Sequence, residues 1–429
     1  MKDGSGLHLG EKLRLIRNAK GISQENMAYA IKSNPTFISR LERGYGECEA
    51  EILRTIRHFL EIENSPLLDH ELEIYENRIN VWEDLITAGR ITDARAMQSE
   101  LSPILGLPFQ EELSLRYMML EVRLLIGETH FLTAKEKFKN AEKLMGNASK
   151  DNLFRYHRNK GYLYPDGDKN ALKHYLQALE LIGVDKPDAG LLYCIGRQYF
   201  IMGKIHYAMR YLERAKAASI GDQNHLISLS IASLIIMCYK YTGECKEAKR
   251  QIDAVIARSL SINNDVLAGL LIMEKGIISN LEGNLNEALE FNNQAYTYLQ
   301  DKHESYVFSI LANKADYLAR MKKIDEYHNT LKLAKPLAKD NELYTILLDS
   351  IDHKINLNDS SSINYIENIA IPMLKTGNGN LDYKFGALQL CRCLEAHYRK
   401  KNAKTKAMAI CCIIKEIYEY MFTGDVEFE

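Results

Sequence analysis

The side chains that most often do chemistry in proteins are dispersed along this sequence. Its 8 cysteines form no C-x-x-C pair, and Cys391 and Cys393 stand two apart, which places them on opposite sides of a helix. Among the 12 histidines, His130, His157 and His174 fall in different expected elements. No P-loop, G-x-G-x-x-G, H-E-x-x-H or G-x-S-x-G motif occurs in a suitable context. These patterns predict a non-enzymatic protein with no metal and no cofactor.

Charge, in contrast, is concentrated at the start of the chain. Residues 1–46 carry eight Lys/Arg against four acidic residues, although the whole chain has a formal net charge of -2. A basic segment ahead of an acidic body indicates, weakly, contact with nucleic acid. The alternative is a solvated basic face on a small helical domain that contacts other proteins.

Four short helices are predicted to position these basic residues. Gly21 ends the first, Ser23 caps the second, and Asn34 caps the third, which has Pro35 in its first turn and stops at Gly44. The expected ranges are 9–20, 24–31, 35–43 and about 49–60. Two short helices joined by a tight turn, with a helix before and after, form a helix-turn-helix bundle.

The bundle carries two motifs of a known family. L-R-x-x-R-x-x-K-G-x-S-Q begins at Leu13, and I-S-R-L-E-x-G begins at Ile38. Both resemble the repressor-type helix-turn-helix domains of phage and Gram-positive regulators. The resemblance implies a phosphate contact from the start of the second helix, groove contacts from the third, and backbone contacts from further basic residues. In that order the residues are Gln24; Pro35, Thr36, Ser39 and Arg40; and Arg43, Arg14, Arg17 and Lys20.

Two positions depart from the family pattern. Lys32 stands where the family usually has a turn glycine, which concerns the geometry of the turn. Pro35 stands where a polar side chain often reads a base, and it offers only an apolar surface, for instance to a thymine methyl group. The second departure bears on direct readout more than on binding.

The rest of the chain is repetitive. The stretches IGRQYFIMGKIHYAMRYLERA, IIMCYKYTGECKEAKRQIDAV and KGIISNLEGNLNEALEFNNQA align without gaps. Their shared small residues recur every 40 positions: Gly203, Gly243 and Gly283; Ala208, Ala248 and Ala288; Ala215, Val255 and Ala295. A turn glycine and small residues where two helices approach resemble tetratricopeptide repeats. Dividing the remaining length by this period predicts about nine helical hairpins after residue 70.

In such arrays the ligand-binding residues lie on the concave inner wall. The first helix of each hairpin forms this wall. Asn can donate and accept hydrogen bonds to an extended peptide, Arg can fork onto a carboxylate, and Tyr and Met supply apolar pockets. The candidates for peptide binding are Arg158, Asn159, Tyr193, Arg197, Lys240, Asn280, Asn313 and Tyr317, with Ser233, Met237, Met273 and Arg320 beside them. The alternative is that several of them merely hydrate a concave surface.

The combination resembles the peptide-sensing regulators of Gram-positive bacteria and their phages, the RRNPP-type quorum-sensing receptors. It implies an all-α chain: a helix-turn-helix DNA-binding domain over 1–65, a hinge over 66–80 around Ser65-Pro66, and a right-handed tetratricopeptide-like solenoid over 81–429. The implied protein is a homodimer that binds an operator in double-stranded DNA and is switched by a short signalling peptide. The alternatives are a scaffold that sequesters a response-regulator-type partner without binding DNA, and a repressor whose array only dimerises.

Composition favours a cytoplasmic protein. The first residues lack the apolar core of a signal peptide, and the most apolar run, 226–238, is interrupted by serines and too short to span a bilayer. We therefore expect the cysteines to be small, buried apolar residues in a reducing compartment. We therefore expect no membrane partner.

Overall fold

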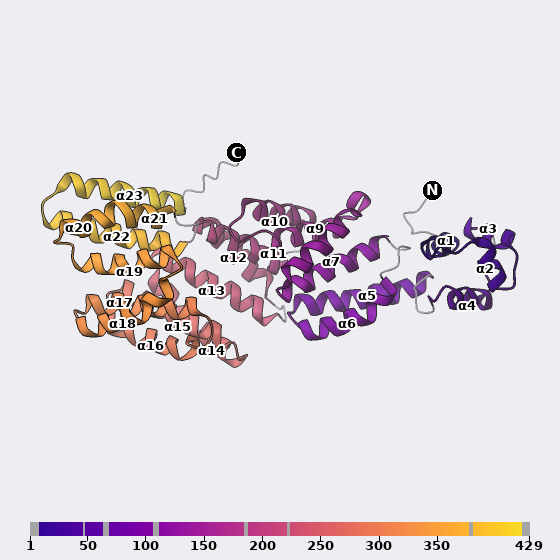
Figure 1. Cartoon of the computed structure of the whole chain (residues 1–429), viewed down its shortest axis with the longest axis horizontal. Helices are drawn as coiled ribbons and strands as arrows, with labels where there is room; N and C mark the ends of the chain where they lie inside the picture. Colours follow the sequence, from indigo (N-terminus) through magenta and orange to yellow (C-terminus); the bar gives the residue numbers. More distant parts are fainter. Residues whose placement is uncertain are drawn as a thin grey trace. The chain divides into compact units, whose positions relative to one another are not determined.

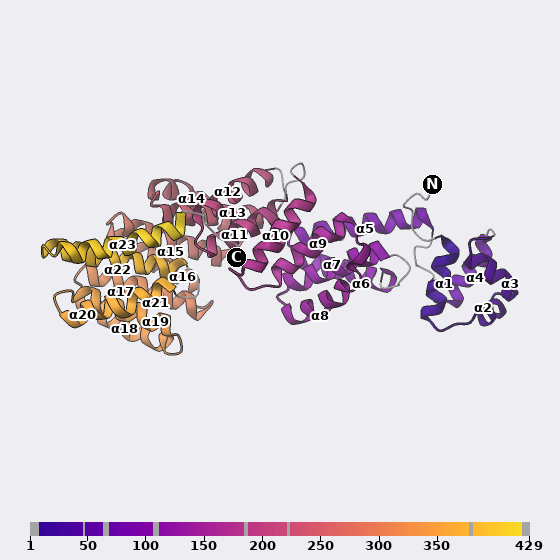
Figure 2. The ribbon, with the colours of Figure 1, turned by 90° about the horizontal axis from the view of Figure 1, so that it is seen from above.

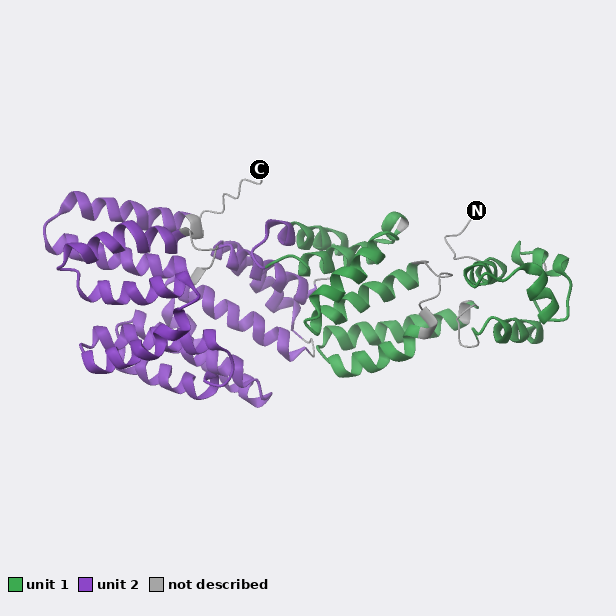
Figure 3. Cartoon of the chain, viewed as in Figure 1, with its two compact units in different colours: residues 1–165, 173–186 green, residues 166–172, 187–429 purple. Residues whose placement is uncertain are grey.

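The computed structural model describes residues 8–45, 48–62, 68–105, 111–183, 188–220, 224–376 and 381–422. Every regular element in these ranges is a helix, which confirms the expected all-α class (Figure 1). The chain divides into two compact units (Figure 3). Unit 1 comprises residues 1–165 and 173–186, and unit 2 comprises residues 166–172 and 187–429.

Unit 1 begins with a bundle of four helices, called the head here: α1 (Leu9–Ala19), α2 (Gln24–Ala30), α3 (Pro35–Glu42) and α4 (Ala50–Phe59). The expected caps start the two middle helices. Ser23 Oγ accepts a hydrogen bond from Asn26 N at 3.0 Å, and Asn34 Oδ1 accepts one from Phe37 N at 2.7 Å. These bonds satisfy amides that the first turn of a helix leaves unpaired.

One apolar core holds the four helices together. Its fully buried members include Leu13, Ile16, Met27, Ile38, Ile56 and Leu60. Gly10 was not singled out from the sequence, yet a Cβ atom there would lie 1.7 Å from the carbonyl oxygen of Leu41. The backbones of α1 and α3 therefore meet at a distance that only glycine permits.

The turn between α2 and α3 keeps the geometry of a glycine turn without a glycine. Lys32 has φ +53°, in the left-handed region, and Ser33 N donates to Ala28 O at 2.8 Å. The departure noted at Lys32 thus changes the residue and not the turn.

Paired helices follow the head in unit 1: α5 (Asp69–Thr87), α6 (Ile91–Leu105), α7 (Glu111–Gly127), α8 (Phe131–Glu142), the short η1 (Met145–Asn147), α9 (Lys150–Tyr162) and α10 (Lys169–Ile182), whose first residues belong to unit 2. Trp82 is fully buried among them; its ring lies 5.1 Å from that of Tyr117, and its Nε1 donates to Ala94 O at 2.8 Å. The expected domain boundary and Ser65-Pro66 lie outside the described residues. From Asp69 onward the segment expected to be a hinge is helical, and Arg57 Nη2 of the head bonds Glu71 Oε2 at 2.5 Å.

Unit 2 continues the pattern (Figures 1 and 2). Its helices are α11 (Ala189–Ile201), α12 (Ile205–Ala218), α13 (His225–Thr242), α14 (Cys245–Ser261), α15 (Asp265–Leu281), α16 (Leu285–Leu299), α17 (Glu304–Arg320), α18 (Ile324–Ala338), α19 (Glu342–Ile355), α20 (Ser360–Tyr365), η2 (Ile366–Ala370), α21 (Ile371–Thr376), α22 (Leu381–Lys400) and α23 (Lys404–Phe422).

The repeat predicted from the sequence is confirmed at its small residues. Gly203, Gly243 and Gly283 have φ of 77°, 83° and 89°, and each stands in the turn within a helix pair. The alanines at 208, 248 and 288 are fully buried at the start of the second helix. Thr129, Lys322 and Asn402 take the same left-handed conformation in other pairs, so the turn requires a conformation more than it requires a glycine.

The last two helices of unit 2, α22 and α23, contact helices near its beginning. The ring of Phe385 on α22 meets that of Tyr241 on α13 edge-on, with centroids 5.2 Å apart, and α23 contacts α12. Helix α13 is 18 residues long, and by length and composition alone it is apolar enough to cross a membrane. Its apolar residues, Leu229 and Ile236 among them, pack against α14 and α15 in the core of the unit.

Candidate functional site

Helix α3 exposes most of the residues expected to meet DNA. Pro35, Thr36 and Arg40 are exposed and Ser39 is half-buried, while Arg43 is exposed directly after the helix. On α1, Arg14 is exposed and bonds Glu11 at 3.2 Å. Lys20, directly after α1, is also exposed and bonds Glu61 at 3.2 Å. Such exposed pairs are weak and are easily exchanged for phosphate contacts.

Arg17 has a different environment from its basic neighbours. Its side chain is 9% exposed, and its Nε and Nη2 bond Glu42 Oε1 and Oε2 at 2.6 and 3.0 Å. Its Nη1 donates to Ile22 O at 2.6 Å, and Gln24 Nε2 donates to Glu42 Oε2 at 2.6 Å. We therefore leave Arg17 out of the DNA surface, because its guanidinium is already bound inside the head. Gln24 is half-buried and keeps its place at the start of α2.

A pocket of about 320 Å³ lies in unit 2. Its walls come mainly from the first helices of successive pairs, α13, α15, α17, α19 and α22, with Leu374 of α21. Four of the eight residues expected to bind peptide line it: Lys240, Asn280, Asn313 and Tyr317. Met273, named beside them from the sequence, lines it as well.

The charged side chains among the described residues that line the pocket occur in pairs. Lys240 Nζ lies 2.7 Å from Glu274 Oε2, and Lys354 forms an ion pair with Asp316. The Lys240 ammonium also stands 4.3 Å from the centre of the Tyr241 ring.

The pocket also combines apolar surface with unused hydrogen-bonding capacity. The rings of Phe308 and Tyr344 stack with centroids 3.8 Å apart. Tyr317 Oη and Gln389 Nε2 are buried and have no hydrogen-bond partner in the ranges that the structure covers. Burial raises the pKa of Tyr317 well above its usual range, so the hydroxyl stays protonated and can donate. A ligand with polar groups here would satisfy atoms that are costly to leave unpaired.

The other four peptide candidates lie outside this pocket. Arg197 on α11 forms a forked pair with Asp166, at 2.5 and 2.6 Å, one turn from the half-buried Tyr193. Arg158 and Asn159 belong to α9 in unit 1. Asn159 is buried and donates to Met119 O at 2.7 Å, which ties neighbouring pairs together.

Sequence reasoning missed the acidic and basic partners in the pocket, Glu274, Asp316 and Lys354. A signal for them existed. Side chains about one repeat apart face each other on successive first helices: Lys240 and Glu274 are 34 residues apart, and Asp316 and Lys354 are 38 apart. Searching for charge pairs at the repeat distance would have found both.

Within the described residues, no group of three or more His, Cys, Asp or Glu side chains is placed to hold a metal ion. The chain is thus an all-helical protein in which a bundle of four short helices is followed by tetratricopeptide-like helix pairs.

Known proteins share this fold. A Rap protein complexed with competence and sporulation factor superposes with a TM-score of 0.64 at 13% identity, over 81% of this chain and 99% of the other. The apo quorum sensor NprR from B. thuringiensis gives 0.63 at 16% identity, with 81% and 99% covered. The Rap conjugation gene regulator of plasmid pLS20 with the Phr* peptide gives 0.52 at 15%, with 82% and 98% covered. The resemblance to peptide-sensing regulators is thus confirmed in fold.

No protein-family model and no curated protein sequence matches the chain.

Proposed function

We propose that this chain is a cytoplasmic transcription regulator, active as a homodimer, that binds operator DNA through α3 and is switched by a short peptide. The observation that carries the proposal is the unit 2 pocket, which gathers Lys240, Asn280, Asn313 and Tyr317 from three successive first helices. The protein would act without catalysis, as a ligand-controlled DNA reader.

The exposed face of α3 supports the DNA-binding half. Thr36, Ser39 and Arg40 can reach base edges from a helix that lies in the major groove, and Pro35 adds an apolar contact. Arg14, Lys20 and Arg43 add positive charge around that helix, where phosphates would lie. Gln24 stands at the N-terminal end of α2, where backbone amides also favour a phosphate.

The pocket supports the peptide half. Its apolar walls suit an aliphatic or aromatic side chain, and its amides and phenol suit peptide N–H and C=O groups. Asn313 is well suited to hold a peptide backbone because its amide both donates and accepts.

Coupling between the halves needs two arrangements of the dimer that the peptide binds unequally. Each pair in a solenoid contacts its neighbours, so a ligand across several pairs alters how the array curves. In a dimer that curvature sets the spacing of two heads, and operator half-sites require a fixed spacing. A strong switch requires a difference in binding free energy of about 5 kcal/mol between the two arrangements.

The DNA proposal is tested by selecting bound duplexes from a random pool and comparing variants on the selected site. We expect Arg40→Ala to weaken binding by about 1–3 kcal/mol with an unchanged helical spectrum. Arg54→Ala, which removes an exposed arginine from α4, is the matched control and should bind as the wild type does. Equal affinities for all three proteins would refute the placement of α3. Sedimentation of the protein–DNA complex gives the stoichiometry.

The peptide proposal is tested by calorimetry with synthetic peptides taken from the C-terminal ends of small open reading frames beside the gene. We expect Asn313→Ala to lose roughly tenfold or more in affinity, about 1.4 kcal/mol. Asn293→Ala, on the exposed side of α16, should bind normally. Peptide binding without any selected DNA would instead favour the scaffold that sequesters a protein partner.

A further inference from the structure

One glycine on the wall of the unit 2 pocket stands where a helix would favour another residue. Gly386 lies inside α22, a helix of 20 residues, and it lines the pocket. Apart from proline, glycine is the least favourable residue in the interior of a helix. A glycine at such a position therefore needs a physical reason, either the close approach of another segment or a space that must stay open.

Close approach does not account for Gly386. It does account for three other glycines inside helices of unit 2, where a Cβ atom would lie 3.0 Å or less from a neighbouring side chain or carbonyl oxygen: Gly196, Gly269 and Gly276. At Gly386 the nearest described atoms to a Cβ would be Leu347 Cδ2 at 3.6 Å and Leu374 Cδ1 at 3.9 Å, which are ordinary van der Waals distances. No described neighbour therefore prevents an alanine at this position.

The space beside Gly386 is part of the pocket. Leu347 and Leu374, the side chains that a Cβ atom would meet, both line the pocket, and Gly386 itself is half-buried. The other pocket residues around it on α22 follow the spacing of one helical face: Tyr383, Gln389 and Leu390. The absence of a side chain at 386 thus leaves an apolar recess in the pocket wall.

Unpaired hydrogen-bond donors line the same pocket. Gln389 Nε2, about one turn from Gly386 on α22, is buried and has no partner among the described residues, and the same holds for Tyr317 Oη on α17. Tyr317 is 1% exposed. Both groups can donate, so they suit a ligand group that accepts a hydrogen bond, such as a peptide carbonyl.

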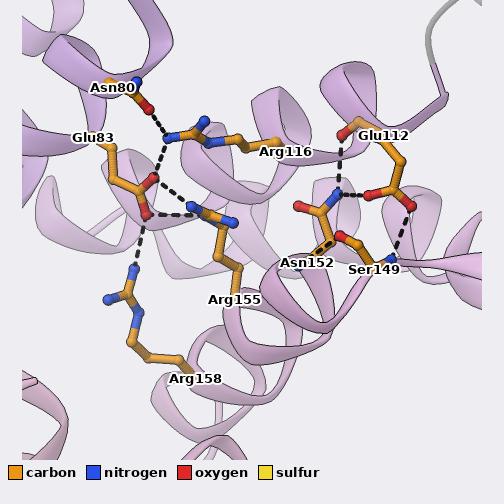
Figure 4. A network of polar contacts seen from close by, with 8 residues as sticks. All are labelled: Asn80, Glu83, Glu112, Arg116, Ser149, Asn152, Arg155 and Arg158. Carbon is orange, nitrogen blue, oxygen red and sulfur yellow. Dashed lines mark hydrogen bonds and ion pairs between the residues drawn. The ribbon is translucent and has the colours of Figure 1, made fainter. Parts of the chain in front are cut away.

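Polar side chains on first helices do not by themselves indicate a ligand. In unit 1, Arg155 on α9 and Arg116 on α7 both bond Glu83 on α5, so these groups link successive helices (Figure 4). Glu112 and Asn152 join α7 to α9 in the same way. In unit 2 a cavity adjoins the unpaired donors, and this combination indicates a ligand.

We propose that Gly386 determines which ligand residue the pocket accepts. Because position 386 has no side chain, a large aliphatic side chain of the ligand can lie against the backbone of α22, next to Leu347 and Leu374. The carbonyl groups that flank this side chain accept from Gln389 or Tyr317. A volume of about 320 Å³ is at the lower end for ligand pockets, so it suits one part of a peptide. The assignment rests on the peptide function proposed above and adds the class of residue that is selected.

Blocked amino acids test the assignment without DNA and without the natural peptide. N-acetyl-leucine methylamide has a large aliphatic side chain between two amides, N-acetyl-alanine methylamide has a short one, and N-acetylglycine methylamide has none. Their affinities for the full chain are measured by ligand-observed nuclear magnetic resonance. The melting temperature of each variant without a ligand is measured by circular dichroism.

We expect the wild type to bind the leucine probe at least about tenfold more tightly than the glycine probe, because the leucine side chain buries more apolar surface. Gly386→Ala should weaken binding of the leucine probe roughly tenfold, because the added methyl group occupies the recess. The alanine probe should lose much less, since its short side chain leaves room for that methyl group. Without a ligand, Gly386→Ala should melt about 2–4 °C higher, because alanine favours the helix.

Asn293→Ala is the matched control. It also replaces a poor helix former by alanine, at an exposed position of α16 that does not line the pocket. It should therefore raise the melting temperature without changing the affinity for any probe. The comparison separates stabilisation of a helix from filling of the recess.

Three results would overturn the role of Gly386. If Gly386→Ala melts below the wild type, packing requires the glycine and the space is not kept for a ligand. If it binds the leucine probe as the wild type does, the recess is not occupied. If the wild type binds the three probes equally, or none of them, the pocket selects no aliphatic residue.

The test also separates this role from the proposed peptide function. A loss of affinity for the leucine probe in Asn313→Ala, with none in Gly386→Ala, would overturn the role of Gly386 and leave the peptide pocket standing. The reverse case is a leucine probe that depends on Gly386 while no peptide from the neighbouring reading frames binds. That result would support the recess and contradict the proposed natural ligand.

Discussion

Arg17 and Glu42 form a buried, forked ion pair across the head, with Nε–Oε1 at 2.6 Å and Nη2–Oε2 at 3.0 Å. The pair joins the end of α1 to the end of α3, and Gln24 at the start of α2 bonds the same carboxylate. Glu42 thus connects three of the four helices that would present the DNA-binding face.

Breaking this pair should therefore destabilise the head. Arg17→Ala leaves a buried carboxylate without its cation, which costs about 3–5 kcal/mol. In the full chain, we expect the free energy of opening measured by hydrogen exchange at the α1 and α3 amides to fall by that amount. Arg14→Ala, which breaks an exposed pair, should lower it by less than about 1 kcal/mol. Equal protection in both variants would show that the head does not depend on Glu42.

Lys32 gives a prediction of the opposite sign. It occupies the left-handed region at φ +53°, where a side chain is strained and glycine is not. Lys32→Gly should stabilise the head by up to about 1 kcal/mol. Lys32→Ala keeps the strain and serves as the control, so the difference between the two variants in the same exchange experiment isolates the backbone term. A glycine variant no more stable than the alanine variant would contradict the strain argument.

Substitutions at Lys240 and Glu274 can separate the effect of charge on the stability of unit 2 from the effect of side-chain shape. Their side chains are 2% and 11% exposed, so Glu274→Gln removes a counter-ion from a buried ammonium and should cost about 3–5 kcal/mol in unit 2. The double change Lys240→Met and Glu274→Leu should recover most of that loss, because apolar side chains of similar volume replace the pair. Urea unfolding followed by circular dichroism measures both. A double variant as unstable as the single one would mean that the pair itself is required.

The histidine pair of unit 1 predicts a dependence on pH. His157 Nδ1 lies 2.9 Å from His174 Nδ1, and burial together with His157 lowers the pKa of His174 to about 4. Unfolded histidine has a pKa near 6.5, so the unfolded chain binds more protons between these values. The contribution of His174 to the free energy of unfolding should be fully present above about pH 6.5. It should fall by roughly 1 kcal/mol toward pH 4, after allowance for solvent screening.

Thermal unfolding followed by Trp82 fluorescence measures this effect in unit 1. His174→Phe keeps a ring against Tyr164 but cannot titrate, so the loss between pH 6.5 and 4 should shrink. His130→Gln, at an exposed histidine, should leave it unchanged. Identical pH curves for the wild type and His174→Phe would exclude the pair as the cause.

The sequence predicted best the residues whose requirement is local. A turn after a helix needs a left-handed residue, and close helices need a small one, so Gly243 and Ala248 could be assigned from the three aligned repeats. Gly10 escaped notice because its need arises from Leu41, which approaches it only in the folded head.

Charged residues were harder to place, because charge does not reveal the face of a helix. Arg14 and Arg17 look alike in the sequence, yet one is exposed and the other binds Glu42, 25 residues away. In the same way, only four of the eight residues expected to bind peptide line the pocket. Of the others, Arg197 bonds Asp166, and Asn159 bonds a carbonyl oxygen of the neighbouring pair.

The contact between Phe385 and Tyr241 bears on how unit 2 comes apart. An open row of hairpins frays from its ends, since the terminal hairpin has one neighbour only. Here α22 and α23 touch α13 and α12 as well as their neighbours in the chain, so the final hairpin is held on two sides. Unit 2 should consequently unfold in one cooperative transition. Deleting the final hairpin, α22 and α23, should make the unfolding less cooperative, because the new last hairpin can fray.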